Sequence, residues 1–167
     1  SNGFEVRVTD GREGSFTFAT RILINAAGLS SEQVSAIAGL RKEAYKLKYC
    51  KGSYCRVHNN KARFLKGLVY PVPKKRGAGL GIHATLDLAG GLRLGPDDEY
   101  IEKVEYSVDI SKKRLFYESA RQFLPFLAFE DIEPDMAGIR PKLQGPQEAF
   151  RDFIIKDEEE NGLCGLI

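Results

Sequence analysis

The sequence has few of the residues that build metal and disulfide sites. Only three cysteines and two histidines occur among its 167 residues, and they show neither a C-x-x-C pair nor a Cys/His metal-ligand spacing. Because the cysteine count is odd, we expect no disulfide framework. Cys50, Cys55 and Cys164 are predicted to be buried or half-buried free thiols. No bound metal is expected, and a reducing cytoplasm is the expected compartment.

The sequence also has little net charge and no long apolar run. Its 25 basic and 23 acidic residues leave a formal charge of +2, which gives no general reason to bind nucleic acid or a membrane. No apolar stretch is long enough for a transmembrane helix, and the first residues do not form a signal peptide. Hydrophobic residues nevertheless make up 43% of the chain, so an ordinary globular core is expected.

The first forty residues predict a hairpin, a buried strand and a helix. Apolar and charged residues alternate over 4–8, and a returning strand is expected over 15–20. The continuous apolar run from Ile22 to Ile24 predicts a strand buried on both faces. A capping serine at position 30 or 31 predicts a helix that stops near Gly39.

The rest of the chain favours many strands around one long helix. Separate strands are expected over 45–49, 53–57 and 68–72, and Ala89-Gly90-Gly91 predicts the turn of a hairpin. Ser111 begins the clearest helical pattern. A strand near Ile139 and a last hairpin over 153–167 follow. This order predicts an α+β fold, in which a mixed or antiparallel sheet has flanking helices.

Two short motifs favour ordinary loops and strands over a phosphate site. The run from Gly79 to Ala84 fits the G-x-G-x-x-G/A pattern, but a dinucleotide turn needs a helix to begin at the third small residue. Residues 85–88 alternate as a strand does, so we reject that interpretation. The basic run Lys74-Lys75-Arg76 is interpreted as a solvated loop.

Three side chains are candidates for chemistry. His83 is the leading general base near neutral pH, with a structural imidazole as the alternative. Arg140 stands between Gly138 and Pro141, which suits either a bidentate grip on a carboxylate or a structural salt bridge. Tyr70 could present its hydroxyl to a substrate or be buried.

Several segments, taken in order, resemble the D-amino-acid-oxidase-like superfamily of FAD-dependent oxidoreductases. Within it, the resemblance is greatest to the L-2-hydroxyglutarate oxidase/dehydrogenase branch. The segments cover nearly the whole chain and are, in order, Asn25-Ala26-Ala27-Gly28, Lys51-Gly52-Ser53-Tyr54, Val69-Tyr70-Pro71-Val72-Pro73, Gly81-Ile82-His83-Ala84-Thr85-Leu86-Asp87, Gly91-Leu92-Arg93-Leu94-Gly95-Pro96 and Ala137-Gly138-Ile139-Arg140-Pro141-Lys142-Leu143.

The resemblance implies roles for individual residues. The segment Asn25, Ala26, Ala27 and Gly28 would lie beside the FAD. Arg140 would meet the substrate carboxylate, and His83 would face the flavin as base or substrate ligand. Lys51 and Tyr70 are further pocket candidates. A dicarboxylate would need a second cation, for which Lys51 and Arg93 both stay open.

The resemblance also implies a domain division. Residues 1–40 would be a remnant of the FAD-binding domain, 41–140 the substrate-binding domain, and 141–167 a truncated return toward the first. The N-terminal GxGxxG element that holds the ADP half of FAD is missing, as is the C-terminal segment that contacts the flavin. The isolated fragment is therefore expected to lack FAD and to be inactive.

The implied reaction is oxidation of a small 2-hydroxy acid, L-2-hydroxyglutarate, to the 2-oxo acid by hydride transfer to flavin. Glycine, sarcosine, a D-amino acid or glycerol 3-phosphate are alternative substrates on the same scaffold, and a non-catalytic binding module is an alternative of another class. The expected partner is a small hydroxy acid and not nucleic acid. A peripheral link to the inner membrane or to quinone stays open, as does the oligomeric state.

Overall fold

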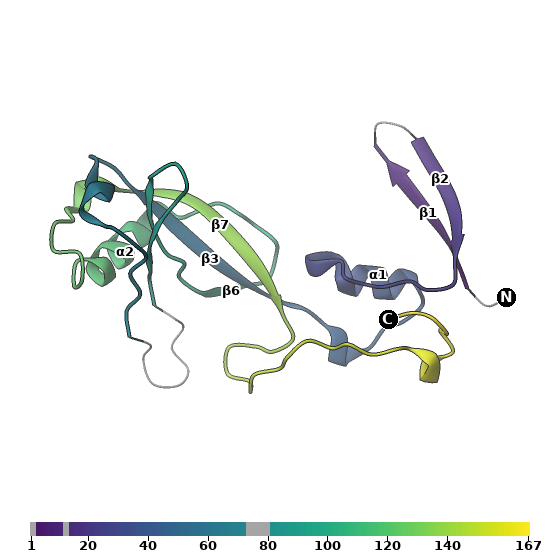
Figure 1. Ribbon diagram of the computed structural model, residues 1–167. Helices are drawn as coiled ribbons and strands as arrows, with labels where there is room; N and C mark the ends of the chain where they lie inside the picture. Colours follow the sequence, from purple (N-terminus) through teal and green to yellow (C-terminus); the bar gives the residue numbers. More distant parts are fainter. Residues whose placement is uncertain (1–2, 12–13, 73–80) are drawn as a thin grey trace. The chain divides into compact units, whose positions relative to one another are not determined.

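The computed structural model describes residues 3–11, 14–72 and 81–167 (Figure 1). The basic run 74–76 and Gly79 therefore lie outside the described residues. The chain divides into two compact units. Unit 1 comprises residues 1–47 and 147–167, and unit 2 comprises residues 48–146. Each unit is described by itself.

Unit 2 is built on an antiparallel sheet in which β3 is the central strand. β3 pairs with β7 along nearly its whole length (Figure 1), with β5 near its end and with β6 near its start, while β4 pairs with the outer edge of β5. The strands are β3 (Lys48–Val57), β4 (Ala84–Leu86), β5 (Leu92–Leu94), β6 (Glu99–Ile101) and β7 (Ile132–Lys142). This sheet, with its flanking helix, confirms the predicted α+β class.

The predicted hairpin around the glycine turn is confirmed as β4 and β5. Its turn is closed by Asp87, whose carboxylate accepts hydrogen bonds from the backbone N–H groups of Ala89 at 3.0 Å and Gly91 at 2.7 Å. The expected strand over 68–72 is reduced to one antiparallel bridge between Val69 and Ala84. That bridge still places residues 69–70 beside the edge of β4.

The predicted helix from Ser111 forms as α2 (Lys113–Ala120), preceded by the 3-10 turn η4 (Ile110–Lys112). Asp109 caps this start, accepting a hydrogen bond from the Ser111 N–H at 2.8 Å. Helical spacing brings the apolar side chains of Phe116, Ala120 and Leu124 into the core, where none is more than 1% exposed. They pack with the buried strand residues Cys55, Val57, Ala84, Leu92, Leu94 and Ile132. Shorter 3-10 turns are η3 (Lys61–Phe64) and η5 (Phe129–Asp131).

Alternation along the strands gives the sheet of unit 2 two distinct faces. Cys55 and Val57 point toward α2, so this is the helix-covered face, and Lys51 and Ser53 share it because they lie at the same alternate positions of β3. We call the other side the open face. Its members are Lys48, Cys50, Gly52, Tyr54 and Arg56 of β3 with their partners Tyr100, Arg93, Thr85, Gly138, Arg140 and Lys142.

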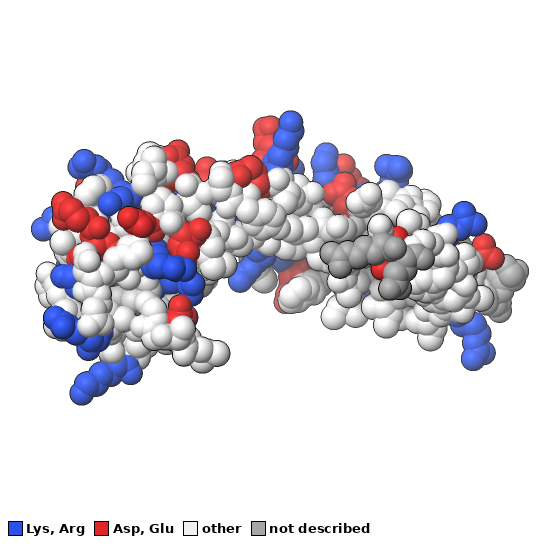
Figure 2. Space-filling model, turned by 90° about the horizontal axis from the view of Figure 1, so that it is seen from above, with Lys and Arg blue, Asp and Glu red and all other residues white. Residues whose placement is uncertain are grey.

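The described residues of unit 1 form a hairpin, the helix α1, three 3-10 turns and two isolated β-bridges. The predicted hairpin forms from β1 (Phe4–Asp10) and β2 (Gly14–Thr20). α1 (Ser31–Ile37) follows the 3-10 turn η1 (Gly28–Ser30), although the Ser30 side chain makes no capping hydrogen bond. Figure 2 shows mostly uncharged atoms over unit 1, on the right, and side chains of both charges over unit 2, on the left.

The prediction that Ile22 to Ile24 is buried on both faces is wrong for the described chain. Leu23 pairs in parallel with Leu166, and its N–H donates to the Gly165 carbonyl at 2.8 Å. The side chains of Ile22 and Ile24, however, are 59% and 66% exposed. A strand of a parallel sheet is buried only where other elements cover both faces, and the described residues of unit 1 provide no such cover.

The expected hairpin over 153–167 is only partly present. Glu158 and Leu163 form one antiparallel bridge around the 3-10 turn η6 (Glu159–Asn161), whereas residues 153–155 form no strand. The strand expected from Tyr45 instead begins at Lys48, because Tyr45 belongs to the 3-10 turn η2 (Glu43–Tyr45). None of the described helices is long and apolar enough to cross a membrane.

Candidate functional site

His83 lies on the open face beside the aromatic ring of Tyr70. It stands between Ile82 and Ala84, which both belong to the core, so alternation directs its side chain away from α2. The Tyr70 and His83 ring centroids are 4.3 Å apart with an interplanar angle of 58°. The bridge between Val69 and Ala84 sets this contact. The imidazole is only 9% exposed, while Tyr70 is 55% exposed.

Arg140 lies on the same open face, toward the other end of the sheet. It is exposed and pairs in register with Cys50 of β3. Among the described residues, its guanidinium has neither an ion pair nor a side-chain hydrogen bond. The sequence left a substrate carboxylate and a structural salt bridge as alternatives for this arginine. No described residue provides the salt bridge.

Two glycines form a patch on the open face between these groups, and only Gly138 leaves its backbone bare, because Pro96 packs against Gly52. Gly52 and Gly138 face each other across β3 and β7, one alternate position away from Arg140. A Cβ atom added at Gly138 would meet nothing within 4 Å, so the backbone there is open to a ligand. Three strand spacings of about 4.8 Å separate His83 from Arg140 across the sheet, and the register also sets His83 several residues along the strands from Cys50, the partner of Arg140. The two side chains therefore do not touch, and the glycine patch lies between them.

Lys51 and Arg93 already have carboxylate partners. Lys51 is 6% exposed on the helix-covered face, where its Nζ contacts Glu105 Oε2 at 3.0 Å and the Ser107 carbonyl. The structure therefore does not bring Lys51 together with Arg140. Arg93 is on the open face, but its guanidinium binds Asp135 at 2.6 Å and Asp87 at 2.8 Å. The hydrogen bond to Asp135 is the main reason that the pKa of Arg93 is raised.

The predicted cofactor segment lies in unit 1. The Asn25 amide donates to the Ser31 carbonyl at 2.8 Å and to Ser35 Oγ at 2.9 Å, which fixes the segment against the start of α1. Ala26, Ala27 and Gly28 are exposed, and a Cβ added at Gly28, where φ is +57°, would meet nothing within 4 Å. A flat cofactor could approach this backbone closely, so the residues present fit the predicted role.

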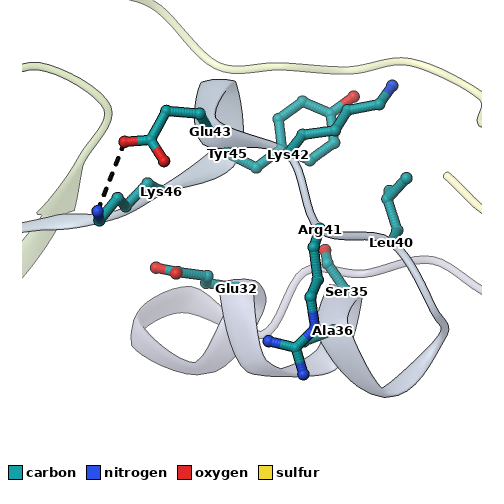
Figure 3. Close-up of a pocket in the computed structure, with 9 residues that line it drawn as sticks. All are labelled: Glu32, Ser35, Ala36, Leu40, Arg41, Lys42, Glu43, Tyr45 and Lys46. Carbon is teal, nitrogen blue, oxygen red and sulfur yellow. Dashed lines mark ion pairs between the residues drawn. The ribbon is translucent and has the colours of Figure 1, made fainter.

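A hollow of unit 1 is lined by several charged side chains that pair with one another or with Glu158. It has a volume of about 220 Å³ and lies between α1 and the segment from Leu40 to Lys46 (Figure 3). Lys42 and Tyr45 both bind the buried carboxylate of Glu158, and Lys46 pairs with Glu43 at 3.5 Å. Since these groups satisfy one another, we do not assign a ligand to this hollow.

A second hollow and the acidic residues also give no site. The hollow, about 350 Å³, lies over the β4–β5 turn, where Arg56, Arg93, Asp87 and Asp135 neutralise one another. In the part of the chain that the structure describes, no group of three His, Cys, Asp or Glu residues could hold a metal ion.

Sequence reasoning missed two lysines that share the open face with Arg140. Lys142 follows Arg140 at the next alternate position of β7, and it lies directly opposite Lys48 of β3. The alternation of Arg140-Pro141-Lys142 could have placed Lys142 beside Arg140. Nothing in the sequence gives the pairing with Lys48, because that depends on the register between two distant strands.

Comparison with known proteins gives the family. The family described as FAD dependent oxidoreductase, DAO, matches residues 1–165. A relative named L-2-hydroxyglutarate dehydrogenase, mitochondrial, from Arabidopsis thaliana is 34% identical over 167 residues, covering 93% of this chain and 34% of the relative. The protein of the same name from Caenorhabditis elegans is 35% identical over 199 residues, covering 99% of this chain and 46% of the relative. The chain thus spans less than half the length of these relatives.

Solved structures share the fold. Glycerol-3-phosphate dehydrogenase from Bacillus halodurans complexed with FAD has a TM-score of 0.64 and 22% identity, over 82% of this chain and 28% of that one. L-alpha-glycerophosphate oxidase from Mycoplasma pneumoniae with FAD bound has a TM-score of 0.59 and 20% identity, over 75% of this chain and 32% of that one. The fold and the match over residues 1–165 together confirm the predicted resemblance: this chain belongs to the DAO family of FAD-dependent oxidoreductases.

Proposed function

We propose that this chain supplies the substrate side of an FAD-dependent enzyme that oxidises a small 2-hydroxy acid to the 2-oxo acid, with L-2-hydroxyglutarate as the substrate. One observation carries the proposal: the guanidinium of Arg140 has no described carboxylate partner, and it shares the open face with His83. The relatives named L-2-hydroxyglutarate dehydrogenase support this choice of substrate.

Arg140 is proposed to hold the carboxylate next to the reacting carbon. A guanidinium presents two parallel N–H donors that match the two oxygens of a carboxylate, so it fixes orientation as well as charge. The exposed side chain of Arg140 has these donors available because no described residue uses them. The substrate would then lie over the bare backbone of Gly138, the partner of Gly52.

His83 is proposed to accept the proton of the substrate hydroxyl. The neighbouring ring of Tyr70, with its centroid 4.3 Å away, limits the positions open to the imidazole. When bound, FAD supplies the acceptor for the hydride that leaves the Cα atom, so that the hydroxy acid loses two electrons and two protons as it becomes the oxo acid. His83 retains one of those protons.

The family's cofactor is FAD, and Asn25 to Gly28 are proposed to contact it. The Asn25 amide anchors the segment to Ser31 and Ser35, which leaves the exposed backbone of Ala26, Ala27 and Gly28 for the contact. Small residues there let a planar ring system or a phosphate approach the chain without meeting side chains.

The first test is the visible spectrum of the complete protein, purified and then mixed with L-2-hydroxyglutarate without oxygen. Flavin bands that bleach with this acid support the proposal. Bands that bleach instead with glycine or with glycerol 3-phosphate would keep the family but replace the substrate. Solved structures of similar fold are named glycine oxidase and glycerol-3-phosphate dehydrogenase. A complete protein that neither contains nor takes up FAD would favour a binding module.

The second test is the variant Arg140→Ala. Losing a charge-assisted, bidentate contact should lower kcat/KM for the hydroxy acid by about a hundredfold. Arg114→Ala is the matched control, because Arg114 is also exposed but belongs to α2. Steady-state kinetics with both variants decides the role of Arg140. An unchanged kcat/KM in Arg140→Ala would remove Arg140 from the site.

A further inference from the structure

Three cations gather at one end of the open face. Arg140 and Lys142 occupy successive alternate positions of β7, so both point to this face. Lys48 of β3 lies directly opposite Lys142. Like charges directly opposite each other across an antiparallel pair are destabilising. The register therefore creates an unfavourable concentration of positive charge that a bound anion would relieve.

No described carboxylate neutralises this end of the face. Neither Lys48 nor Lys142 forms an ion pair with a described residue, and neither does Arg140. Glu102 comes just after β6, on the other side of β3, yet it too has no ion pair among the described residues. Five other cations of unit 2, by contrast, have a carboxylate within 4 Å: Lys51, Arg56, Lys61, Arg93 and Lys112.

Lys142 is held in place by uncharged groups. Its Nζ lies 5.0 Å from the centroid of the Tyr100 ring, the partner of Cys50 on β6. Such a cation–π contact fixes the ammonium without neutralising it. Partial burial opposes the charge, but interactions with the Cys50 thiol and with Tyr100 outweigh it, and the pKa of Lys142 is raised. The lysine therefore keeps its full charge at neutral pH.

We propose that Lys142, with Lys48 opposite it, binds the second carboxylate of a dicarboxylic substrate whose first carboxylate is held by Arg140. The inference rests on the proposed function and adds to it the residue that selects diacids over monoacids. Alternate positions on a strand are roughly 6.6 Å apart. Two long cationic side chains at that spacing can hold both ends of a five-carbon diacid.

The structure favours Lys142 over the two candidates taken from the sequence, Lys51 and Arg93. Lys51 points to the opposite face and is bound to Glu105. Arg93 would have to leave two carboxylates, Asp87 and Asp135, to bind a substrate. Lys142 needs no such exchange, because the groups around it are an aromatic ring and a thiol.

The test compares two acids that differ only at the far end. L-2-hydroxyglutarate and L-2-hydroxyvalerate have the same five-carbon chain and the same hydroxy-acid end, but the second lacks the distal carboxylate. In the complete protein, Lys142→Gln should lower kcat/KM for the diacid roughly ten- to hundredfold. It should leave the value for the monoacid within about twofold. Lys142→Arg should restore much of the preference for the diacid.

Lys113→Gln is the matched control. Lys113 also lies over an aromatic ring, with its Nζ 4.5 Å from the Phe129 centroid, but it belongs to α2. The ratio of the two kcat/KM values should therefore be unchanged in Lys113→Gln. Binding of the unreactive acids glutarate and valerate, followed through the flavin spectrum, gives a readout that does not require turnover. Glutarate should bind more tightly than valerate in the wild type and lose that advantage in Lys142→Gln.

The outcomes separate this inference from the proposed function. If the wild type oxidises L-2-hydroxyglutarate and Lys142→Gln keeps its preference for the diacid, Lys142 is not the selecting residue although the function stands. An equal loss for both acids in Lys142→Gln would show a merely structural lysine. A wild type that neither oxidises the diacid nor binds glutarate more tightly than valerate would overturn both proposals.

Discussion

At the scale of single residues, Lys51 differs from Arg140 and Lys142 in whether its charge has a partner. Lys51 is almost completely buried, and a buried ammonium is costly unless it is paired. Its contacts with Glu105 and the Ser107 carbonyl meet that need, so Lys51 has a structural explanation. Arg140 and Lys142 have no such explanation among the described residues. Their charges are therefore available for a ligand.

The pairing of Lys51 with Glu105 predicts a pH-dependent contribution to stability. The Glu105 carboxylate accepts a hydrogen bond from the Ser107 N–H, and it also binds Ser107 and Lys51 through side-chain contacts. Together these lower its pKa from 4.5 to about 2. Because the folded pKa lies below the unfolded one, the stabilisation is complete above pH 4.5. It is lost as the pH falls toward 2.

Glu105→Gln should therefore lower the urea midpoint of the complete protein at pH 7, and by less at pH 3. The effect is modest, because the Glu105 side chain is 57% exposed and solvent screens the pair. Glu102→Gln is the control, since Glu102 has no described ion pair, and its midpoint should follow the wild type. If Glu105→Gln lowers the urea midpoint by the same amount at pH 7 and at pH 3, the carboxylate charge does not stabilise this fold.

At the scale of elements, the strand register decides what the open face presents. β3 and β7 bring Gly52 opposite Gly138, next to the pair formed by Cys50 and Arg140. The two glycines differ in one useful respect. A Cβ at Gly52 would lie 2.8 Å from Pro96 Cβ, whereas a Cβ at Gly138 would meet nothing within 4 Å. The pair therefore separates an effect on packing from an effect on a bound ligand.

Gly138→Ala should fold as well as the wild type and yet lose activity. Alanine reduces the freedom of the unfolded chain, so Tm should stay equal or rise slightly. If the substrate lies over this backbone, the added methyl group should lower kcat/KM by about tenfold or more. Gly52→Ala, by contrast, should lower Tm because of its contact with Pro96. Full activity in Gly138→Ala would mean that no substrate lies over the glycine patch.

The elements that local sequence patterns specify were predicted well. The hairpin of β4 and β5 follows from its glycine turn, and α2 follows from the helical spacing of Phe116, Ala120 and Leu124. Local sequence context put His83 and Arg140 forward as candidates and the resemblance implied their roles, which remain proposals. The alignment of Lys142 with Lys48 could not be predicted, because the register between two strands so far apart in the sequence is set by tertiary packing. Residues 153–155 are apolar, yet they find no strand partner in the described chain.

At the scale of the whole molecule, the chain matches only part of the length of its relatives. It spans 34% and 46% of the length of two relatives that match almost all of it. Within unit 1, the residues proposed to contact FAD are four small ones, and apolar side chains nearby in the sequence are open to solvent, with Ile24 66% exposed. A group of exposed apolar side chains is typical of a surface that another part of a protein, or another protein, covers.

The last prediction concerns FAD binding by these residues alone. Residues 1–167 expressed alone should bind FAD at least a hundredfold more weakly than the complete protein, because four small residues bury little of so large a cofactor. Titration of FAD fluorescence with each protein measures this difference, and a dye that binds exposed apolar surface should fluoresce more strongly with the isolated chain. Equal affinity for FAD would show that Asn25 to Gly28 and the rest of these 167 residues form the whole cofactor site. The apolar surface of unit 1 would then need another explanation, such as a second copy of the chain.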